Sequence, residues 1–318
     1  MTKERKRLRI VFMGTPEFAV TILDAILKSQ HEVVGVVTVA DKPAGRGQQI
    51  KESAVKVYAK SKNLLILQPE KLKDEQFLSE LKELKADIFV VVAFRMLPEI
   101  VWEMPPKGTF NLHASLLPKY RGAAPINWVL INGEKETGLT TFFINQIIDT
   151  GCILAQKNTS ISENITAGEL HDELMYMGAS LTVETLDKIS TGDIHSIPQD
   201  EELAKNLPHA PKIFKADCEI DWNQYAATIH NKIRGLSPYP AGWCSLLKNG
   251  EKVNFKLFSS KITSEVPDSS VLKKGSDGIL FPCKDYYISV SALQPEGKRR
   301  MNYKEFLAGN DLAAFNIQ

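Results

Sequence analysis

The sequence predicts an α/β fold with a doubly wound, mostly parallel sheet in the first part of the chain and a small β-barrel in the last part. The first part shows apolar strands alternating with amphipathic helices, the pattern of a parallel sheet covered on both faces. The last part shows short segments of alternating polarity with turn residues between them. A chain of 318 residues can hold one large and one small domain.

The elements of the first part follow one another in a regular order. Residues 9–13 form an apolar strand, after which Thr15 is expected to cap a helix that has Pro16 in its first turn. Two longer strands are apolar almost throughout, as strands buried on both faces should be. The expected strands are 9–13, 33–39, 64–67, 87–94, 108–114, 139–144 and 153–156, and the expected helices are 15–27, 53–61, 74–84, 97–104, 125–130 and 166–188.

A polar stretch with three prolines, residues 193–213, is expected to link the two parts. Beyond it the pattern predicts a helix at 225–234 and strands at 255–262, 278–282 and 286–293. The predicted domains are therefore residues 1–192 and 214–318, with 193–213 as the linker.

Composition excludes several classes of protein. Hydrophobic residues at 43% and charged residues at 24% are ordinary for a globular protein. The four cysteines form no CxxC pair, which argues against a zinc ribbon, a redox motif or a disulfide framework, so we expect no metal and a reducing, cytoplasmic location. No stretch reaches the roughly 18 apolar residues that span a bilayer. The apolar part of the N-terminus, Ile10–Met13, is too short for a secretory signal.

Charge is distributed unevenly along the chain. From residue 209 onward there are 15 Lys and Arg against 11 Asp and Glu, whereas the whole chain has a net charge of +1. A mildly basic second part permits contact with nucleic acid, and it is equally compatible with an ordinary solvated surface.

Asn111 and His113 lie at the end of an expected strand, two residues apart, and so point to one face. The carboxyl ends of parallel strands are where such sheets bind ligands. Histidine can move a proton near neutral pH, and an asparagine amide can stabilise an oxyanion, a combination that suits acyl-type transfer. A purely structural pair is an equally good interpretation. Asp149, in the Asp-Thr-Gly loop 149–151, could orient His113, although this tripeptide is also a common turn.

Nucleotide-binding motifs are absent. The turn at Gly14 lacks the GxGxxG pattern, and the basic loop Asp41–Gln49 lacks the Lys-Ser/Thr ending of a P-loop. That loop could cradle phosphate through Arg46 and its backbone amides, or it could be a solvent-exposed loop.

The stretch NLHASLLPKYRGAAP (111–125) closely resembles the signature of the folate-dependent formyltransferases, and Asp149-Thr150-Gly151 matches their companion motif. Further stretches carry the resemblance along nearly the whole chain: MGTPEFA (13–19), DKPAGRGQQ (41–49), INWVLINGEKETG (126–138) and LQPEGKRRM (293–301). Within this family the chain is most similar to the members that act on initiator tRNA. One departure is Arg95, where the family usually has a small residue.

The resemblance implies a donor, an acceptor and a set of site residues. The donor would be the cosubstrate 10-formyltetrahydrofolate, and the acceptor the α-amino group of methionine on initiator tRNA. His113 would relay the amine proton, Asn111 would stabilise the oxyanion, and Asp149 would hold His113. The implied folate-binding residues are Ala93, Leu97, Ser115, Leu116, Leu117 and Pro118, and the implied tRNA-binding residues are Lys42, Arg46, Arg299 and Arg300.

Other interpretations remain open. A sister formyltransferase that modifies a small amine, such as an amino-sugar nucleotide, would keep the same Asn, His and Asp. A folate-dependent hydrolase or dehydrogenase module is a further enzyme alternative. A protein that binds tRNA or folate without catalysis would not need all three residues. The resemblance also implies that the last part is a barrel of oligonucleotide-binding type, and we expect a monomer because no exposed apolar helix suggests otherwise.

Overall fold

The computed structural model of the protein describes residues 6–44 and 49–317. Contacts between residues divide it into two units. The first unit contains the chain up to Gly122, Gly138–Thr159 and His171–His209, and the second contains Ala123–Thr137, Ser160–Leu170 and the chain from Ala210 onward. Each unit has its own sheet.

The first unit is built on a seven-stranded sheet in the order β5-β2-β1-β6-β7-β8-β9. The five strands from β5 to β7 are parallel, and β8 is antiparallel to β7. The predicted mostly parallel sheet is therefore confirmed. Its strands are β1 (Arg9–Gly14), β2 (Glu32–Val37), β5 (Ile66–Leu67), β6 (Ile88–Val92), β7 (Thr109–His113), β8 (Glu136–Phe143) and β9 (Ile153–Ser160).

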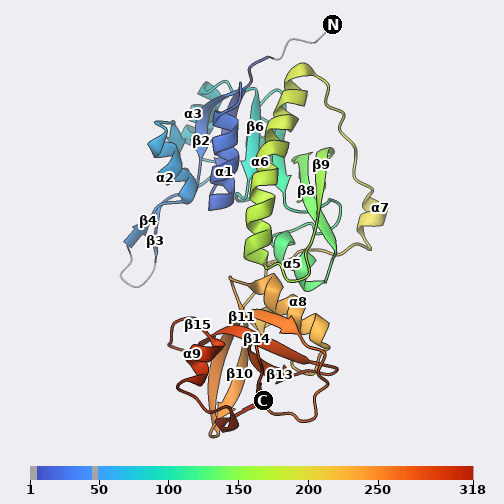
Figure 1. Cartoon of the computed structure of the whole chain (residues 1–318). Coiled ribbons are helices and arrows are strands. Elements are labelled where there is room, and N and C mark those ends of the chain that lie inside the picture. Colours follow the sequence, from blue (N-terminus) through green and yellow to red (C-terminus); the bar gives the residue numbers. More distant parts are fainter. Residues whose placement is uncertain (1–5, 45–48, 318) are drawn as a thin grey trace. The chain divides into compact units, whose positions relative to one another are not determined.

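Helices cover both faces of this sheet. On one face, Val11 and Met13 of β1 pack with side chains of α3 (Glu75–Glu83) and α4 (Glu99–Trp102). Helices α1 (Glu17–Leu27) and α6 (Ala167–Thr191) run across the opposite face (Figure 1). Two shorter helices of the first unit are α2 (Ala54–Ser61) and α7 (Glu201–Ala204).

The second unit is an antiparallel sheet in the order β12-β13-β14-β11-β10-β16, with β15 paired to β14. A single bridge between Val271, beside β12, and Asn316 of β16 joins the two ends of that order, so the sheet curls into a barrel. Its strands are β10 (Gly242–Lys248), β11 (Glu251–Ile262), β12 (Lys273–Lys274), β13 (Ile279–Pro282), β14 (Tyr287–Pro295), β15 (Met301–Asn302) and β16 (Phe315–Ile317).

Aromatic side chains fill this barrel. Trp222 stacks on Phe281 at 4.4 Å between ring centroids, and Phe255 meets Phe306 and Phe315 edge-on. Helix α8 (Ala226–Leu236) packs on β11 and on α5 (Pro125–Ile131), which belongs to the same unit. The remaining helical segments are α9 (Tyr303–Leu307), η1 (Ala216–Cys218) and η2 (Leu312–Ala314).

Four local expectations need correction. Thr15 does not cap α1, because the cap position is occupied by Pro16 and no side-chain hydrogen bond caps the helix. The loop 41–49 contains strand β3 (Lys42–Ala44), which pairs with β4 (Gln49–Lys51). The expected strand 153–156 continues to Ser160, and β10 was not expected at all.

The segment 193–213 is more ordered than a simple linker. It carries α7, and Ile197 forms a bridge with Ile153 of β9. Contacts assign the chain as far as His209 to the first unit. The domain boundaries drawn from the sequence stay a prediction. None of the described helices is long and apolar enough to cross a membrane.

Candidate active site

Strand β7 brings the first two candidate residues together. It lies between β6 and β8 in the interior of the sheet, and its carboxyl end carries Asn111 and His113. Residues two apart on a strand project from the same face. His113 is buried and Asn111 is half-buried. Among the residues that the structure describes, none forms a hydrogen bond with the Asn111 side-chain amide, which leaves it free for a ligand.

The contacts of His113 define its tautomer. Its Nε2 lies 2.8 Å from the carbonyl oxygen of Tyr120. Because a carbonyl oxygen only accepts, Nε2 carries the hydrogen and donates it. In the neutral ring the lone pair is therefore on Nδ1, and Nδ1 lies 3.8 Å from Oδ2 of Asp149. This arrangement leaves Nδ1 able to accept a proton beside a carboxylate.

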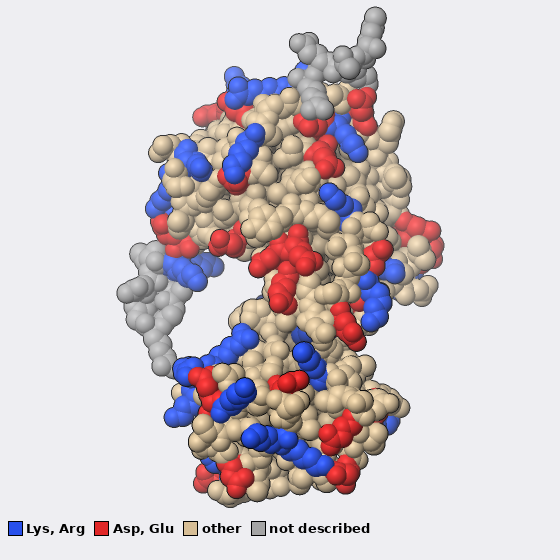
Figure 2. Space-filling model, in the orientation of Figure 1, with Lys and Arg blue, Asp and Glu red and all other residues tan. Residues whose placement is uncertain are grey.

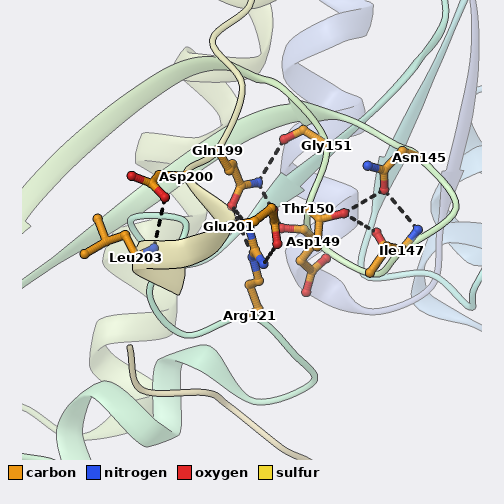
Figure 3. A network of polar contacts seen from close by, with 10 residues as sticks. All are labelled: Arg121, Asn145, Ile147, Asp149, Thr150, Gly151, Gln199, Asp200, Glu201 and Leu203. Carbon is orange, nitrogen blue, oxygen red and sulfur yellow. Dashed lines mark hydrogen bonds and ion pairs between the residues drawn. The ribbon is translucent and has the colours of Figure 1, made fainter. Parts of the chain in front are cut away.

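Asp149 stands in the loop that joins β8 and β9, where Asn145, Ile147 and Thr150 form a turn closed by the Asn145 side chain (Figure 3). Asn145 Oδ1 accepts from the Ile147 amide at 3.1 Å. Asp149 has a left-handed backbone with φ of 57°, and its Oδ2 accepts a hydrogen bond from the Gly122 amide at 2.8 Å. The structure thus brings the predicted Asp149 to the predicted His113.

Close approach of the backbone explains the glycine of this loop. A Cβ at position 151 would lie 1.6 Å from the carbonyl oxygen of Phe143, so no other residue fits there without displacing the strand end. The Asp-Thr-Gly motif therefore has a structural requirement at its glycine in addition to any chemistry at its aspartate.

The loop after β7, Ser115–Pro118, is held by internal hydrogen bonds. The buried Ser115 hydroxyl donates to the Lys119 carbonyl at 2.6 Å, and Thr140 donates to the Ser115 carbonyl at 2.7 Å. Leu117 is buried, its carbonyl accepts from Gln156, and its bond to Pro118 is cis. Leu116 and Pro118 are half-buried. Ser115 shapes this loop, and a direct contact between its hydroxyl and folate stays a prediction.

The end of β6 supplies the neighbouring segment. Ala93 is exposed and has a left-handed backbone with φ of 47°, whereas Leu97 is buried in the core beneath it. Arg95 donates to the carbonyls of Pro69 and Glu70 and lies over the Phe94 ring. Burial lowers the pKa of its guanidinium. Arg95 therefore joins the segment after β6 to the loop that carries Pro69 and Glu70.

The predicted tRNA-binding residues are distributed over both units. Lys42 is exposed on β3, and Arg46 lies outside the described residues. On the second unit Arg299 is paired with Glu305, and Arg300 lies over the ring of Phe258 at 4.3 Å. Figure 2 shows Lys and Arg on the surface of this unit with Asp and Glu among them. A role of these residues in binding tRNA stays a prediction.

Sequence reasoning missed two buried residues near the Asp149 loop: Gln199, which contacts the loop, and Arg121, which contacts Gln199. Arg121 donates to Gln199, and Gln199 donates to the carbonyls of Asp149 and Gly151. Arg121 belongs to the quoted motif but was given no role, and Gln199 fell in the predicted linker. A glutamine in a polar stretch carries no signal of burial, so the sequence could not have singled it out.

Comparison with known proteins supplies the family. The model described as "Formyl transferase" matches residues 8–186, and the model described as "Formyl transferase, C-terminal domain" matches residues 212–311. The chain belongs to the formyl transferase family. The doubly wound unit and the barrel correspond to these two matches in order along the chain.

Individual relatives within the family are similar over their full length. A methionyl-tRNA formyltransferase of Flavobacterium johnsoniae is 51% identical over 306 residues, 96% of each chain. One of Bacteroides fragilis is 50% identical over 99% of each chain. The N-formyltransferase of Helicobacter canadensis, solved with folinic acid and dTDP-3-aminofucose, has a TM-score of 0.67 at 23% identity, with 89% of this chain and 98% of that chain covered. This last similarity concerns the fold alone.

No group of three or more His, Cys, Asp or Glu that could hold a metal ion occurs within residues 6–44 and 49–317. The carboxyl end of β7 and the Asp149 loop offer acid–base and hydrogen-bonding groups: an imidazole, a carboxylate and an amide. Such a set can orient two bound substrates, move a proton and stabilise a developing oxyanion.

Proposed function

We propose that this chain transfers the formyl group of 10-formyltetrahydrofolate to the α-amino group of methionine on initiator methionyl-tRNA. The observation that carries the proposal is that Nδ1 of His113, at the carboxyl end of β7, faces the Asp149 carboxylate at 3.8 Å, with Asn111 two residues away on the same face of the strand. The full-length similarity to methionyl-tRNA formyltransferases supports this acceptor.

The chemistry needs no nucleophile from the protein. The amine nitrogen attacks the formyl carbon, the bond from that carbon to the folate nitrogen breaks, and one proton passes from the amine to the leaving nitrogen. Free α-amino groups titrate near pH ~7.7–8, and attachment of the methionine to tRNA through an ester lowers this pKa further, so a large share of the acceptor is already neutral at physiological pH. The protein must orient the two substrates and provide the proton path.

Each of the three side chains has one role in this step. Nδ1 of His113 accepts the amine proton and returns it to the leaving nitrogen, because the Tyr120 carbonyl holds the hydrogen of the ring on Nε2. The Asp149 carboxylate stabilises the imidazolium that forms between the two transfers. The amide of Asn111 donates to the oxyanion of the tetrahedral intermediate.

The substrates would lie on either side of these residues. Ala93, Leu97 and the loop Ser115–Pro118 would form the folate site, with the buried Leu97, Ser115 and Leu117 acting through the shape of the backbone around it. Lys42, Arg46, Arg299 and Arg300 would hold the tRNA through its phosphates. Aminoacyl-tRNA is a cytoplasmic molecule, which supports a cytoplasmic location, and we expect the chain to act as a monomer.

The test is a transfer assay with a radiolabelled formyl donor. The purified chain should label methionyl-tRNA and leave an amino-sugar nucleotide, such as a dTDP-amino sugar, unlabelled. Labelling of the sugar alone would replace this proposal with the sister activity. Binding of folate without transfer to either acceptor would indicate a protein that has lost catalysis. Light scattering on the same sample measures the oligomeric state.

A further inference from the structure

The side chain of Gln199, in the segment after α6, reaches the Asp149 loop. Gln199 is buried, and its amide nitrogen donates two hydrogen bonds, to the carbonyl of Asp149 at 2.9 Å and to that of Gly151 at 2.8 Å (Figure 3). Both hydrogens of the amide are therefore used on the backbone of the loop that carries the proposed catalytic aspartate.

Arg121 determines which way this amide points. Its Nε and Nη2 donate to Oε1 of Gln199 at 3.1 and 2.7 Å. An arginine donates only, so the oxygen of the amide must face Arg121 and the nitrogen must face the loop. Glu201 accepts two further hydrogen bonds from the guanidinium, at 3.1 and 2.8 Å, and balances its charge.

The backbone directly after Arg121 also holds the side chain of Asp149. The amide of Gly122, directly after Arg121, donates to Asp149 Oδ2 at 2.8 Å. Asp149 is thus held at its backbone carbonyl by Gln199 and at its carboxylate by Gly122. Its φ of 57° is unfavourable for a residue with a Cβ, so the loop requires such contacts to keep this conformation.

We propose that Gln199, oriented by Arg121, is a positioning residue that holds the Asp149 carboxylate against Nδ1 of His113. It touches no reacting atom and acts only through Asp149. The inference concerns the reaction proposed above and rests on that function for its kinetic consequence, whereas its structural consequence can be measured without any substrate. It also assigns part of the segment first interpreted as a linker to the catalytic unit.

The structural consequence is tested by hydrogen exchange of the whole chain, followed by mass spectrometry of peptides that cover residues 144–152. Gln199→Leu has nearly the same size and removes both hydrogen bonds, so amides of this loop should exchange on the order of tenfold faster. Asp200→Asn is the matched control one residue along, since asparagine can still accept from the Leu203 amide as the cap of α7. Equal exchange of the loop in both variants would overturn the proposal.

A second substitution covers the case in which Gln199→Leu does not fold. Gln199→Glu keeps the acceptor for Arg121 but cannot donate to the two carbonyls, so it should loosen the same loop. If this variant folds and its loop exchanges at the wild-type rate, the hydrogen bonds from Gln199 do not hold Asp149 and the proposal is wrong.

The kinetic consequence is tested by a double-mutant cycle with methionyl-tRNA as acceptor. Gln199→Leu alone should lower kcat about 10–100-fold while the KM for the folate donor changes less than about twofold, since misplacement of a catalytic group costs that much. In the presence of Asp149→Asn, the same substitution should cost almost nothing more, because its effect passes through the missing carboxylate. If the losses of kcat from the two substitutions multiply, Gln199 acts independently of Asp149 and its role is merely structural. If the wild-type chain shows no transferase activity but Gln199→Leu still speeds hydrogen exchange in the loop, the proposed function is wrong and the positioning role of Gln199 stands.

Discussion

Two buried histidines, one in each unit, show how neighbouring groups decide what an imidazole can do. His113 of β7 and His230 of α8 both have Nε2 directed at a backbone carbonyl, that of Tyr120 at 2.8 Å and that of Glu163 at 3.3 Å. Both neutral rings therefore carry their hydrogen on Nε2. They differ at Nδ1, which faces the Asp149 carboxylate in the first case and the Ser260 hydroxyl at 3.0 Å in the second.

This single difference separates a proposed catalytic group from a structural one. A carboxylate stabilises the protonated ring, whereas a hydroxyl serves a neutral ring by donating to its lone pair. Burial lowers the pKa of His230, and the nearby Arg234 lowers it further, although the Glu163 carbonyl acts in the opposite direction. His230 is thus a neutral packing residue of the second unit, and the residue type alone could not have distinguished the two.

Exchanging each histidine for glutamine gives the largest expected contrast. His113→Gln keeps a donor for the Tyr120 carbonyl but cannot shuttle a proton, so kcat for formyl transfer should fall about 10²–10⁴-fold. His230→Gln should leave kcat within about twofold. Steady-state kinetics on both variants, with thermal unfolding as a check of folding, measure this. Similar losses in the two variants would contradict the assignment of roles.

The next largest effect is expected at Asn111. Its amide has no partner among the described residues, so Asn111→Ala should leave stability nearly unchanged. As an oxyanion donor it should contribute about 10²–10³ in kcat. Single-turnover measurements with saturating donor and acceptor would separate this loss from weaker binding. If the variant instead loses only donor affinity, Asn111 binds the ground state and does not stabilise the intermediate.

A smaller effect is expected on the surface of the barrel. Arg300 lies over Phe258 and Arg299 is paired with Glu305, so Arg300 has more positive charge to offer to phosphate. Arg300→Ala should raise the KM for methionyl-tRNA severalfold and reduce the slope of log KM against the logarithm of the salt concentration by about 1. Arg299→Ala is the matched control and should change both quantities less. An unchanged salt dependence in Arg300→Ala would remove this residue from the proposed interface.

The smallest effect concerns stability and belongs to His230. Its pKa is lowered in the folded state relative to the usual 6.5, so the unfolded chain binds the proton first as the pH falls. The free energy of unfolding should therefore be highest above about pH 7 and decrease below it, by at most about 1.4 kcal/mol per pH unit from this group. Urea unfolding between pH 5 and 8 should show a flatter profile in His230→Gln. Parallel profiles would mean that His230 titrates equally in both states.

The sequence by itself determined the features that depend on local periodicity and on family motifs. Apolar runs placed β1, β2 and β6, and the resemblance of residues 111–125 indicated the family that the two domain models confirm. Side-chain caps at Ser53 and Asp74 begin α2 and α3 where the pattern predicted these helices. The prediction that Thr15 caps α1 was wrong, because a favourable residue type does not guarantee the capping hydrogen bond.

Only the tertiary structure decided which polar groups meet. His113 meets Asp149 and the Tyr120 carbonyl, and Gln199 meets the carbonyls of Asp149 and Gly151. Each of these contacts joins residues that are distant in sequence or separated by an irregular loop. The closing bridge from Val271 to Asn316 is of the same kind. Periodicity records which face of an element is buried, because burial follows hydrophobicity at each position. It does not record the partner of a polar side chain, because that partner depends on how the packed elements bring their ends together.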